Sequence, residues 1–388
     1  MLIEIHMLKN YPPTCLNRDD TGTPKTCYFG GVQRGRISSQ CLKRSWRTSA
    51  LFETLRSRGW RSRNLPGMVS KELGDMPDKA IAHVKKLIID LLKSDSKNAA
   101  KEGNGRKATS SANRGKKKEG ITGQVVFFTS DEARFLADTI HSLWEKEAGE
   151  SVEKFLEIKT DNIKKEVETI KARAITLDIA LFGRMVTSEA FVNVEAAMQV
   201  AHAVSTHALD LESDYFAAVD DLLTGQDDAG AGMLGDIDFD SCCYYQYASL
   251  DMDKLRETLK DSPEALARVD ELIPVLLKVM ALSNPSGKQN SFAGHVAPEV
   301  MLVEFKSDKI PLSYVNAFAK PVSRYSTQIV KDSADRLAQE VDLMDDFYAL
   351  PVAHRAWMSL RSETAPRVCE RFGSLADLTD ACAAWARE

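Results

Sequence analysis

Strand-like segments lie on both sides of a long helical block in this chain, and that order limits the folds open to it. Leu2–Leu8 alternates apolar with polar side chains, as a strand with two unlike faces does. Cys243–Ala248 and Val300–Phe305 are also strand-like, and the helical segment Pro263–Val279 lies between them. Residues 60–175 instead carry apolar residues at helical spacing. We therefore predict an α+β fold with a helical insertion.

Capping residues and apolar spacing predict the helices. Ser38 or Ser39 can cap a helix that runs to about Arg58. Thr129 and Glu132 form a capping box, in which each residue satisfies the other's unpaired backbone amide. Further helices, the last of them inferred from its alanine content, are predicted at Lys79–Lys93, Val152–Ala174 and Glu189–Ala208.

Two segments hold too few apolar residues to form a core of their own. Ser94–Gly120 consists mainly of Lys, Gly, Ser, Asn and Ala, so we predict a flexible basic loop. Asp210–Asp240 is acidic and rich in Gly, which indicates a projecting hairpin or arm.

The composition favours a cytoplasmic protein without a membrane partner. Hydrophobic residues make up 44% and charged residues 28%, an ordinary globular balance. The longest stretch without a charged side chain is Ala196–Leu209, too short for the roughly 20 residues of a membrane helix. The N-terminus lacks the apolar run of a signal peptide. The 7 cysteines include no CxxC pair, which is typical of reduced thiols.

Charge is distributed unevenly along the chain, although the formal net charge is only -5. Residues 1–120 hold 25 Lys and Arg against 11 Asp and Glu, whereas residues 121–388 hold 26 against 45. Met185–Asp253 contains no Lys or Arg. A basic first third indicates a polyanionic partner, unless folding mixes the charges in space.

Signatures of nucleotide and metal sites are missing. There is no GxxxxGK[ST] and no GxGxxG after a strand. His202 and His207 lack HExxH spacing, so we expect core or hydrogen-bonded histidines. Asp236–Asp240 begins like an EF-hand loop but lacks the Gly and Glu that follow in one. Cys242 and Cys243 are adjacent, which suits buried thiols better than a metal. We predict no metal and no cofactor.

The segment FGGVQRGRISSQCLKR, Phe29–Arg44, has the chemistry of a phosphodiester-binding site. Glycines allow a close approach of the main chain to a ligand, and a helix N-terminus attracts phosphate. A capped, solvated helix would have the same composition. Hydrogen-bonding and cationic side chains follow at Ser38, Ser39, Gln40, Lys43, Arg44 and Arg47.

These motifs resemble those of the CasC-type backbone subunits of the type I-E CRISPR Cascade complex, which belong to the RAMP superfamily. The resemblance runs in order from residue 3 to about residue 320. The segments that carry it are Cys15–Asp20, Phe29–Arg44, Ala180–Ser188, Ala201–His207, Phe216–Leu222, Gly287–Gln289 and Val315–Phe318.

The resemblance implies an α+β protein with an RRM-like (ferredoxin-like) palm, a large helical finger insertion and a projecting thumb hairpin. It divides the chain into palm at 1–59, finger at 60–174 (with the flexible basic loop at 94–120), palm at 175–208, thumb at 209–240, and palm with a C-terminal helical region at 241–388.

It also implies a non-catalytic subunit that binds CRISPR RNA. About six copies polymerise head to tail along the guide, displace one nucleotide in every six, and present the rest for pairing with the target DNA strand. Further implied partners are a 5'-handle cap, a 3'-hairpin endonuclease subunit, and large and small subunits. The expected RNA contacts, with Met185 as the wedge near the kink, are Lys25, Arg34, Arg36, Ser38, Ser39, Gln40, Lys43, Arg44, Arg47, Arg184, Met185, Lys288 and Gln289.

An alternative function is a backbone subunit with Mg-dependent target-RNA endonuclease activity, because related subunits of type III complexes cut RNA with a loop acid. Asp19 or Asp20 would supply that acid here. The neighbouring Arg18 favours instead a salt bridge or a loop anchor. The chain also departs from the family after its double glycine, where only Arg34 and Arg36 are charged, which changes the phosphate contacts to be expected.

Overall fold

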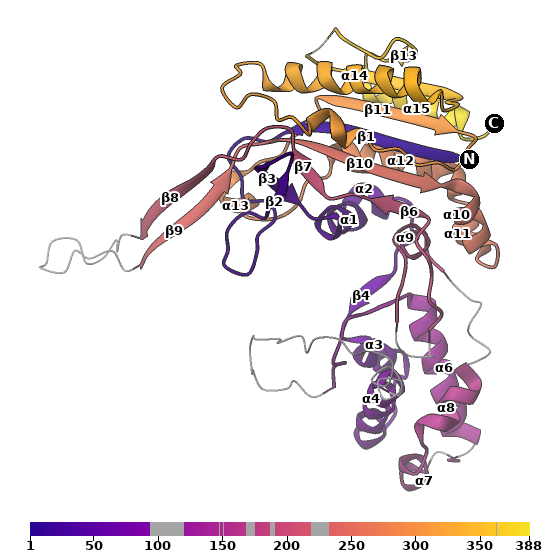
Figure 1. Ribbon diagram of the computed structural model, residues 1–388. Helices are drawn as coiled ribbons and strands as arrows, with labels where there is room; N and C mark the ends of the chain where they lie inside the picture. Colours follow the sequence, from indigo (N-terminus) through magenta and orange to yellow (C-terminus); the bar gives the residue numbers. More distant parts are fainter. Residues whose placement is uncertain are drawn as a thin grey trace, which may run out of the picture. The chain divides into compact units, whose positions relative to one another are not determined.

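The computed structural model describes residues 1–93, 120–146, 148–149, 151–167, 175–186, 191–218, 233–361 and 363–388. These residues form two units, which are treated separately (Figure 1). The first contains Met1–Arg56, Met198–Asp253 and Arg268–Glu388, and the second contains Ser57–Ala197 and Lys254–Ala267. The predicted basic loop lies outside the described residues except for Gly120. Among the described residues, no helix is long and apolar enough to cross a membrane.

A nine-stranded sheet forms the centre of the first unit, in the order β13-β12-β11-β1-β10-β7-β3-β2, with β6 paired to β10. All three predicted strands are present in it as β1, β10 and β11. The strands are β1 Leu2–Asn10, β2 Thr26–Phe29, β3 Val32–Ile37, β6 Met198–Val200, β7 Ala203–Ser205, β10 Cys243–Asp251, β11 Val300–Lys306, β12 His354–Ser359 and β13 Glu370–Arg371.

The middle of this sheet has the connectivity expected of an RRM-like palm. β1 pairs antiparallel with β10 on one side and with β11 on the other, and β10 pairs antiparallel with β6 and β7. Helices α1 (Ser39–Arg47) and α2 (Ala50–Glu53) follow β1 along the chain, and α12 (Val269–Leu282) connects β10 to β11. The result is the β-α-β-β-α-β order of a ferredoxin-like domain, which confirms the predicted α+β, RRM-like fold class.

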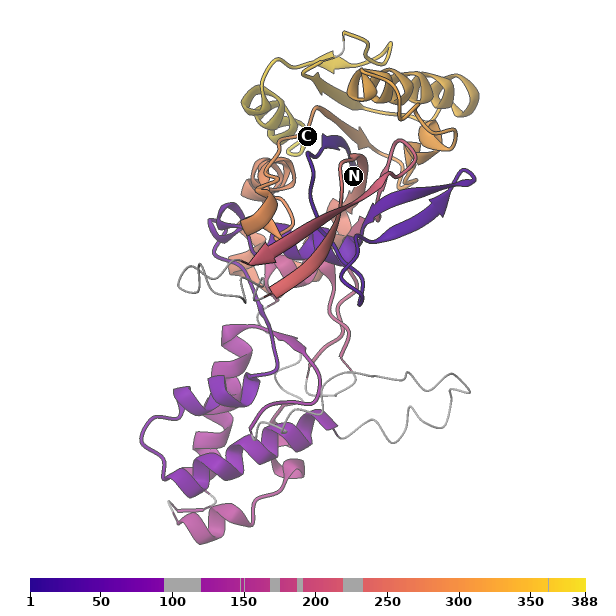
Figure 2. The same ribbon diagram turned by 90° about the vertical axis from the view of Figure 1, so that its left-hand side faces the viewer.

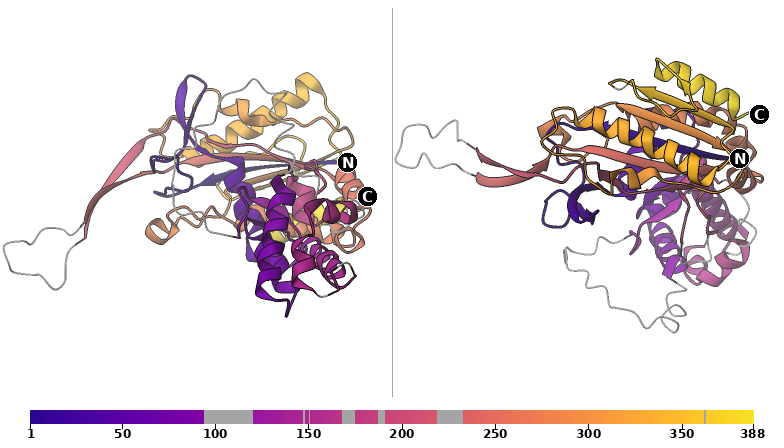
Figure 3. Two further views of the ribbon diagram at one scale, coloured as in Figure 1. Left: turned by 90° about the horizontal axis from the view of Figure 1, so that it is seen from below. Right: turned by 45° about the horizontal axis from the view of Figure 1, so that its top comes forward.

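Helices cover both faces of the sheet. The alternation within β1 places Leu8 on the face that packs against α14 (Ile329–Tyr348) and the 3-10 turn η2 (Tyr314–Phe318). Figure 1 shows α12 and α2 on the opposite side, and Figure 3 shows α14 lying along the strands. The remaining helices outside the insertion are α10 Met252–Leu259, α11 Pro263–Leu266, α13 Gln289–Phe292 and α15 Leu375–Trp385.

An antiparallel hairpin extends from this unit, as predicted for the acidic arm. It consists of β8 (Leu211–Ala218) and β9 (Met233–Asp240), with Leu211 opposite Asp240. Residues 219–232 of the predicted arm lie outside the described part. The base of the hairpin is attached to the loop between β1 and β2, because Asp240 and Thr14 exchange backbone hydrogen bonds.

The second unit has a helical core, which Figure 2 shows in purple and magenta. The predicted capping box is present: the Thr129 amide donates to Glu132 Oε2 at 2.8 Å, and the Glu132 amide donates to Thr129 Oγ1 at 3.0 Å. The elements are β4 Trp60–Ser62, α3 Leu65–Glu72, α4 Asp78–Lys93, β5 Val126–Phe128, α6 Ser130–Lys146, α7 Val152–Leu156, α8 Thr160–Val167 and α9 Leu177–Phe182.

The predicted helix Glu189–Ala208 was wrong. The described part of this segment holds β6 and β7 and no helix, because pairing with β10 outweighs the helix propensity of its alanines. Three other predicted helices are interrupted. The described part of Val152–Ala174 is split into α7 and α8. The one expected to reach Arg58 ends at Arg47, and Ser49 then caps α2. Pro263–Val279 is split into α11 and α12.

Candidate nucleic-acid interface

The β2–β3 hairpin turns through Gly30 and Gly31, which have φ values of 61° and 79°. A Cβ on Gly30 would lie 1.7 Å from the Ala319 carbonyl oxygen, whereas a Cβ on Gly31 would meet nothing within 4 Å. The sequence predicted that this double glycine lets a ligand approach the main chain closely. In the structure, the group that lies close to Gly30 is the chain's own backbone at Ala319.

Arg34 on β3 is fully buried. Its guanidinium donates to the carbonyl oxygens of Ser205 at 2.9 Å, Phe318 at 2.7 Å and Phe29 at 3.2 Å. The expectation that Arg34 contacts RNA does not fit this position, because the bonds to Ser205 and Phe318 fasten the hairpin to the rest of its unit and the bond to Phe29 lies within the hairpin. Arg47, another expected contact, is also buried.

The N-terminus of α1 is fixed by two side chains. Ser38 caps the helix by accepting a hydrogen bond from the Cys41 amide at 3.3 Å. The Ser38 amide donates to Asn17 Oδ1 at 2.8 Å, and the Asn17 carbonyl accepts from the Lys25 amide at 2.8 Å. Asn17 thus ties the loop between β1 and β2 to the start of α1. The expected contacts Ser39 and Gln40 occupy the first turn of this helix.

Three cations lie around this helix, with Arg44 in its last turn, and we call Lys25, Arg36 and Arg44 the α1 basic cluster. Burial raises the pKa of the Cys41 thiol, while Lys25 and Arg44 act in the opposite direction, so both lie near it. The Arg36 guanidinium donates to the Thr26 carbonyl at 3.1 Å. No ion pair within the described residues involves the three cations. Lys43, another of the expected cations, lies half-buried on the same helix.

A second loop meets the β1–β2 loop. A Cβ on Gly287 would lie 2.2 Å from the Leu16 carbonyl oxygen, so the two backbones touch there. Lys288 follows, half-buried and with a φ of 50°. Gln289 Nε2 donates to the carbonyl oxygens of Pro285 at 2.9 Å and Gly294 at 3.4 Å. Gln289 therefore shapes its own loop, and Lys288 is the cation that this loop contributes.

Arg184 and Met185 belong to the second unit and differ sharply in exposure. Arg184 is 4% exposed and forms an ion pair with Glu132 at 2.8 Å, which makes it a core anchor of that unit. Met185 is 92% exposed. An apolar side chain with this exposure suits the predicted wedge.

The acidic pair of the alternative nuclease lies in the exposed part of the β1–β2 loop. Asp19 Oδ1 accepts hydrogen bonds from the amides of Thr21, Gly22 and Thr23 at 2.9, 3.0 and 3.1 Å. Hydrogen bonds, first that of the Thr21 hydroxyl, lower the pKa of Asp19. Asp19 thus organises the turn. None of the ion pairs between described residues joins it to Arg18.

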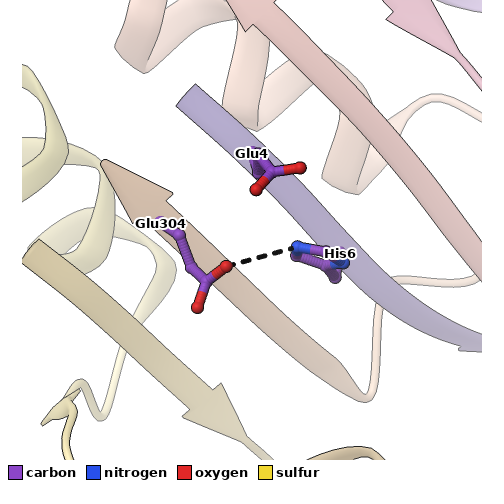
Figure 4. Close-up of side chains that lie close together, drawn as sticks. All are labelled: Glu4, His6 and Glu304. Carbon is purple, nitrogen blue, oxygen red and sulfur yellow. Dashed lines mark ion pairs between the residues drawn. The ribbon is translucent and has the colours of Figure 1, made fainter. Parts of the chain in front are cut away.

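Among the described residues, one group of three has the spacing of a metal site: Glu4 and His6 on β1, and Glu304 on β11 (Figure 4). Lys306 forms ion pairs with Glu4 and, at 3.5 Å, with Glu304, and Arg355 Nε lies 2.6 Å from Glu304 Oε1. Burial lowers the pKa of His6 well below its usual range, with Lys306 contributing. Protein cations therefore already neutralise both carboxylates, and we interpret the group as a buried ion network.

The two histidines of the Ala201–His207 motif differ in environment. His207 is buried, and its Nδ1 lies 2.9 Å from the Ala208 carbonyl, as expected of a hydrogen-bonded core histidine. His202 is also hydrogen-bonded, but it is exposed and its Nδ1 lies 2.9 Å from Arg36 Nη1. It therefore joins the α1 basic cluster. The sequence does not show that residues 36 and 202 meet, because only the long-range pairing of β3 with β7 brings them together.

Comparison with known proteins agrees with this architecture. Residues 3–381 match the Cas_CT1975 family model, described as CT1975-like protein. No curated protein matches the chain. One solved structure, titled "CRISPR RNA-guided surveillance complex, pre-nicking", is 24% identical with a TM-score of 0.79. Another, titled "CRISPR RNA-guided surveillance complex", is 20% identical with a TM-score of 0.60. Each match covers 100% of both chains, and at these identities it shows a shared fold.

Proposed function

This chain belongs to the family of CT1975-like proteins, and on that premise we propose that it is a non-catalytic, CRISPR RNA-binding backbone subunit of a type I-E Cascade-type surveillance complex. In this proposal, copies polymerise head to tail along the guide RNA and displace one nucleotide in every six. The remaining bases pair with invading DNA. The titles of the two similar structures, both RNA-guided complexes, support the assignment.

The observation that carries the proposal is the α1 basic cluster. Lys25 lies near Cys41 in the first turn of α1 and Arg44 lies in its last turn, and the first turn holds no acidic residue. Gln40 is exposed at the same turn and adds hydrogen-bonding groups. Point charges, amides and a helix dipole are the groups that bind phosphates irrespective of sequence.

The covered sheet supports a protein that holds the RNA backbone and leaves the bases to pairing. An RRM that reads bases stacks them on aromatic side chains of its open sheet face. Here α14 and η2 cover that face, and Tyr245 and Trp357, which lie on it, are buried in the core. In the proposal, the cations at α1 form the main RNA-binding surface of this unit.

The wedge and the hairpin would deform the guide. Met185 offers an exposed apolar side chain, and inserting such a side chain between stacked bases unstacks them. The β8–β9 hairpin is anchored at the β1–β2 loop, because the Thr23 hydroxyl donates to Asp238 at 2.8 Å. In the proposal this hairpin is the thumb that folds over the RNA of a neighbouring copy.

The experiment that tests the function is purification of the full chain, followed by extraction and sequencing of any bound RNA. We expect assemblies that contain CRISPR RNA, and a Lys25→Gln, Arg44→Gln variant that yields far less RNA with the same thermal stability. A nucleic-acid-free monomer would contradict the proposal.

The same preparation tests the non-catalytic assignment. Complementary RNA is added with Mg²⁺ and the products are sized. We expect intact RNA, because Asp19 is committed to hydrogen bonds within its own turn. Regularly spaced cuts that disappear in Asp19→Ala or Asp20→Ala would establish the endonuclease instead.

A further inference from the structure

The hydrogen bond between His202 and Arg36 can have only one direction. A guanidinium has only donors, so the 2.9 Å contact requires His202 Nδ1 to accept from Arg36 Nη1. In the neutral ring the proton then resides on Nε2, the nitrogen on the other edge. His202 is exposed, which leaves that N–H accessible to a ligand.

Both partners are held by the sheet. Arg36 pairs with Val204 across β3 and β7, and its amide donates to the Lys25 carbonyl at 2.8 Å. His202 lies between β6 and β7, and the amide of the preceding Ala201 donates to the Tyr247 carbonyl at 3.0 Å. The imidazole is therefore positioned by rigid elements and adds a donor to the α1 basic cluster.

Building on the proposed function, we propose that His202 is a further RNA-backbone contact, which donates from Nε2 to a phosphate oxygen and takes up a proton when RNA binds. A neutral donor is present before binding. The phosphate then favours the imidazolium, in which Nδ1 carries the added proton, so the hydrogen bond between Nδ1 and Arg36 breaks and the Arg36 guanidinium turns to the phosphate as its acceptor. No bond between heavy atoms is made or broken, and the proton comes from solvent.

Among the described residues, the charged groups that act on His202 are two cations. Burial lowers the pKa of His202, and Arg36 on β3 and Lys25 before β2 lower it further. An arriving phosphate neutralises these cations and adds a negative charge, so the pKa rises in the complex. At pH values between the His202 pKa of the free chain and that of the complex, the complex therefore binds more protons than the free chain. RNA affinity must then increase as the pH falls through that range.

The test measures the affinity of the full chain for a mixed-sequence oligoribonucleotide between about pH 5.5 and pH 8 at constant ionic strength. We expect about a tenfold gain in affinity for each unit by which RNA raises the His202 pKa. His202→Gln should abolish most of this gain, while at pH 8 its affinity stays within about threefold of the wild type, because Gln keeps an acceptor and a donor.

Two control variants separate His202 from other ionisable groups of the chain. His141 is an exposed histidine on α6, and His141→Gln should retain the full pH dependence. Burial raises the pKa of Asp240, at the base of the hairpin, to about 6, so Asp240→Asn should also retain it. A pH dependence that persists in His202→Gln overturns the proposal.

Calorimetry of the wild type in two buffers of different ionisation enthalpy gives an independent count of protons and needs no variant. Net proton uptake on binding supports the proposal, and its absence overturns it. If the RNA affinity is high but independent of pH, the role proposed for His202 is wrong and the proposed RNA-binding function stands. Failure to bind RNA at any pH removes the proposed function as well.

Discussion

Arginines that look alike in the sequence have unlike roles here. Arg34 and Arg36 are two positions apart on β3 and therefore on the same face. Arg34 is buried and its guanidinium donates a hydrogen bond to the Phe318 carbonyl, whereas Arg36 lies half-buried beside the exposed His202. The difference comes from what covers each position, which is chain far away in sequence.

Exchanging single arginines separates these roles. Arg34→Gln leaves buried carbonyls without a donor and should lower the free energy of unfolding by about 3 kcal/mol. The exposed Arg44→Gln should leave it within about 0.5 kcal/mol and weaken RNA binding. For each phosphate that the variant no longer neutralises, the slope of log affinity against log salt should become shallower by about 0.7. Chemical denaturation and RNA titrations check both. An Arg34→Gln protein of unchanged stability would contradict the structural role.

Asp240 gives a pH-dependent prediction. Burial raises its pKa from 3.8 to about 6, so the fold favours the protonated acid. Its stabilising contribution is present below about pH 4 and is lost as the pH rises through about 6. Asp240→Asn, which keeps an acceptor for the Tyr244 hydroxyl, should therefore raise the free energy of unfolding at pH 8 by up to about 3 kcal/mol. Its effect should shrink near pH 4. Denaturation curves at both pH values measure this, and equal effects at both would contradict it.

At the scale of elements, local patterns predicted what local interactions determine. The Thr129–Glu132 capping box was predicted because both partners lie within one turn. The alternation of Leu2–Leu8 predicted β1 because strand periodicity is local too. The segment Glu189–Ala208 was misread because its strands are stabilised by β10, which follows much later in the chain. For the same reason the sequence could not reveal that Asn17 fixes Ser38.

The β2–β3 turn offers a matched pair of variants. Gly30→Ala places a Cβ 1.7 Å from the Ala319 oxygen in addition to its positive φ, so it should cost several kcal/mol of stability, about 3 or more. Gly31→Ala meets open space and should cost only about 1 kcal/mol for its φ. Thermal unfolding compares the two variants. Equal losses of stability would mean that backbone strain, and not the clash with Ala319, sets the cost.

At the scale of the whole molecule, the uneven charge distribution makes a prediction about assembly. The hairpin region within Met185–Asp253 is free of Lys and Arg, whereas the first third of the chain is strongly basic. We expect one copy to attract the next, so self-association without RNA should be stronger at about 50 mM salt than at about 500 mM. Sedimentation velocity measures it, and association that is indifferent to salt would contradict the expectation.

A charge-reduced hairpin provides the control. Glu212, Asp214 and Asp236 are exposed on β8 and β9, and neutralising all three as Glu212→Gln, Asp214→Asn and Asp236→Asn should weaken the low-salt association. Neutralising three exposed acids of α6 should leave it unchanged; these are Asp131, Asp138 and Glu145.

The ion network beneath α14 constrains how this chain can evolve. Glu4, Glu304, Lys306 and Arg355 form ion pairs within the core, and Arg355 also pairs with Asp345 at 2.7 Å. Removing one member leaves its partner as an uncompensated buried charge, at a cost of about 3–5 kcal/mol, whereas replacing the set with apolar residues of similar volume leaves none. These positions are therefore expected to change together in evolution, with Asp345 as a further partner of Arg355. A homologue that lacks one of these carboxylates should also lack a cation, and the inheritance of the group as a block would mark common descent.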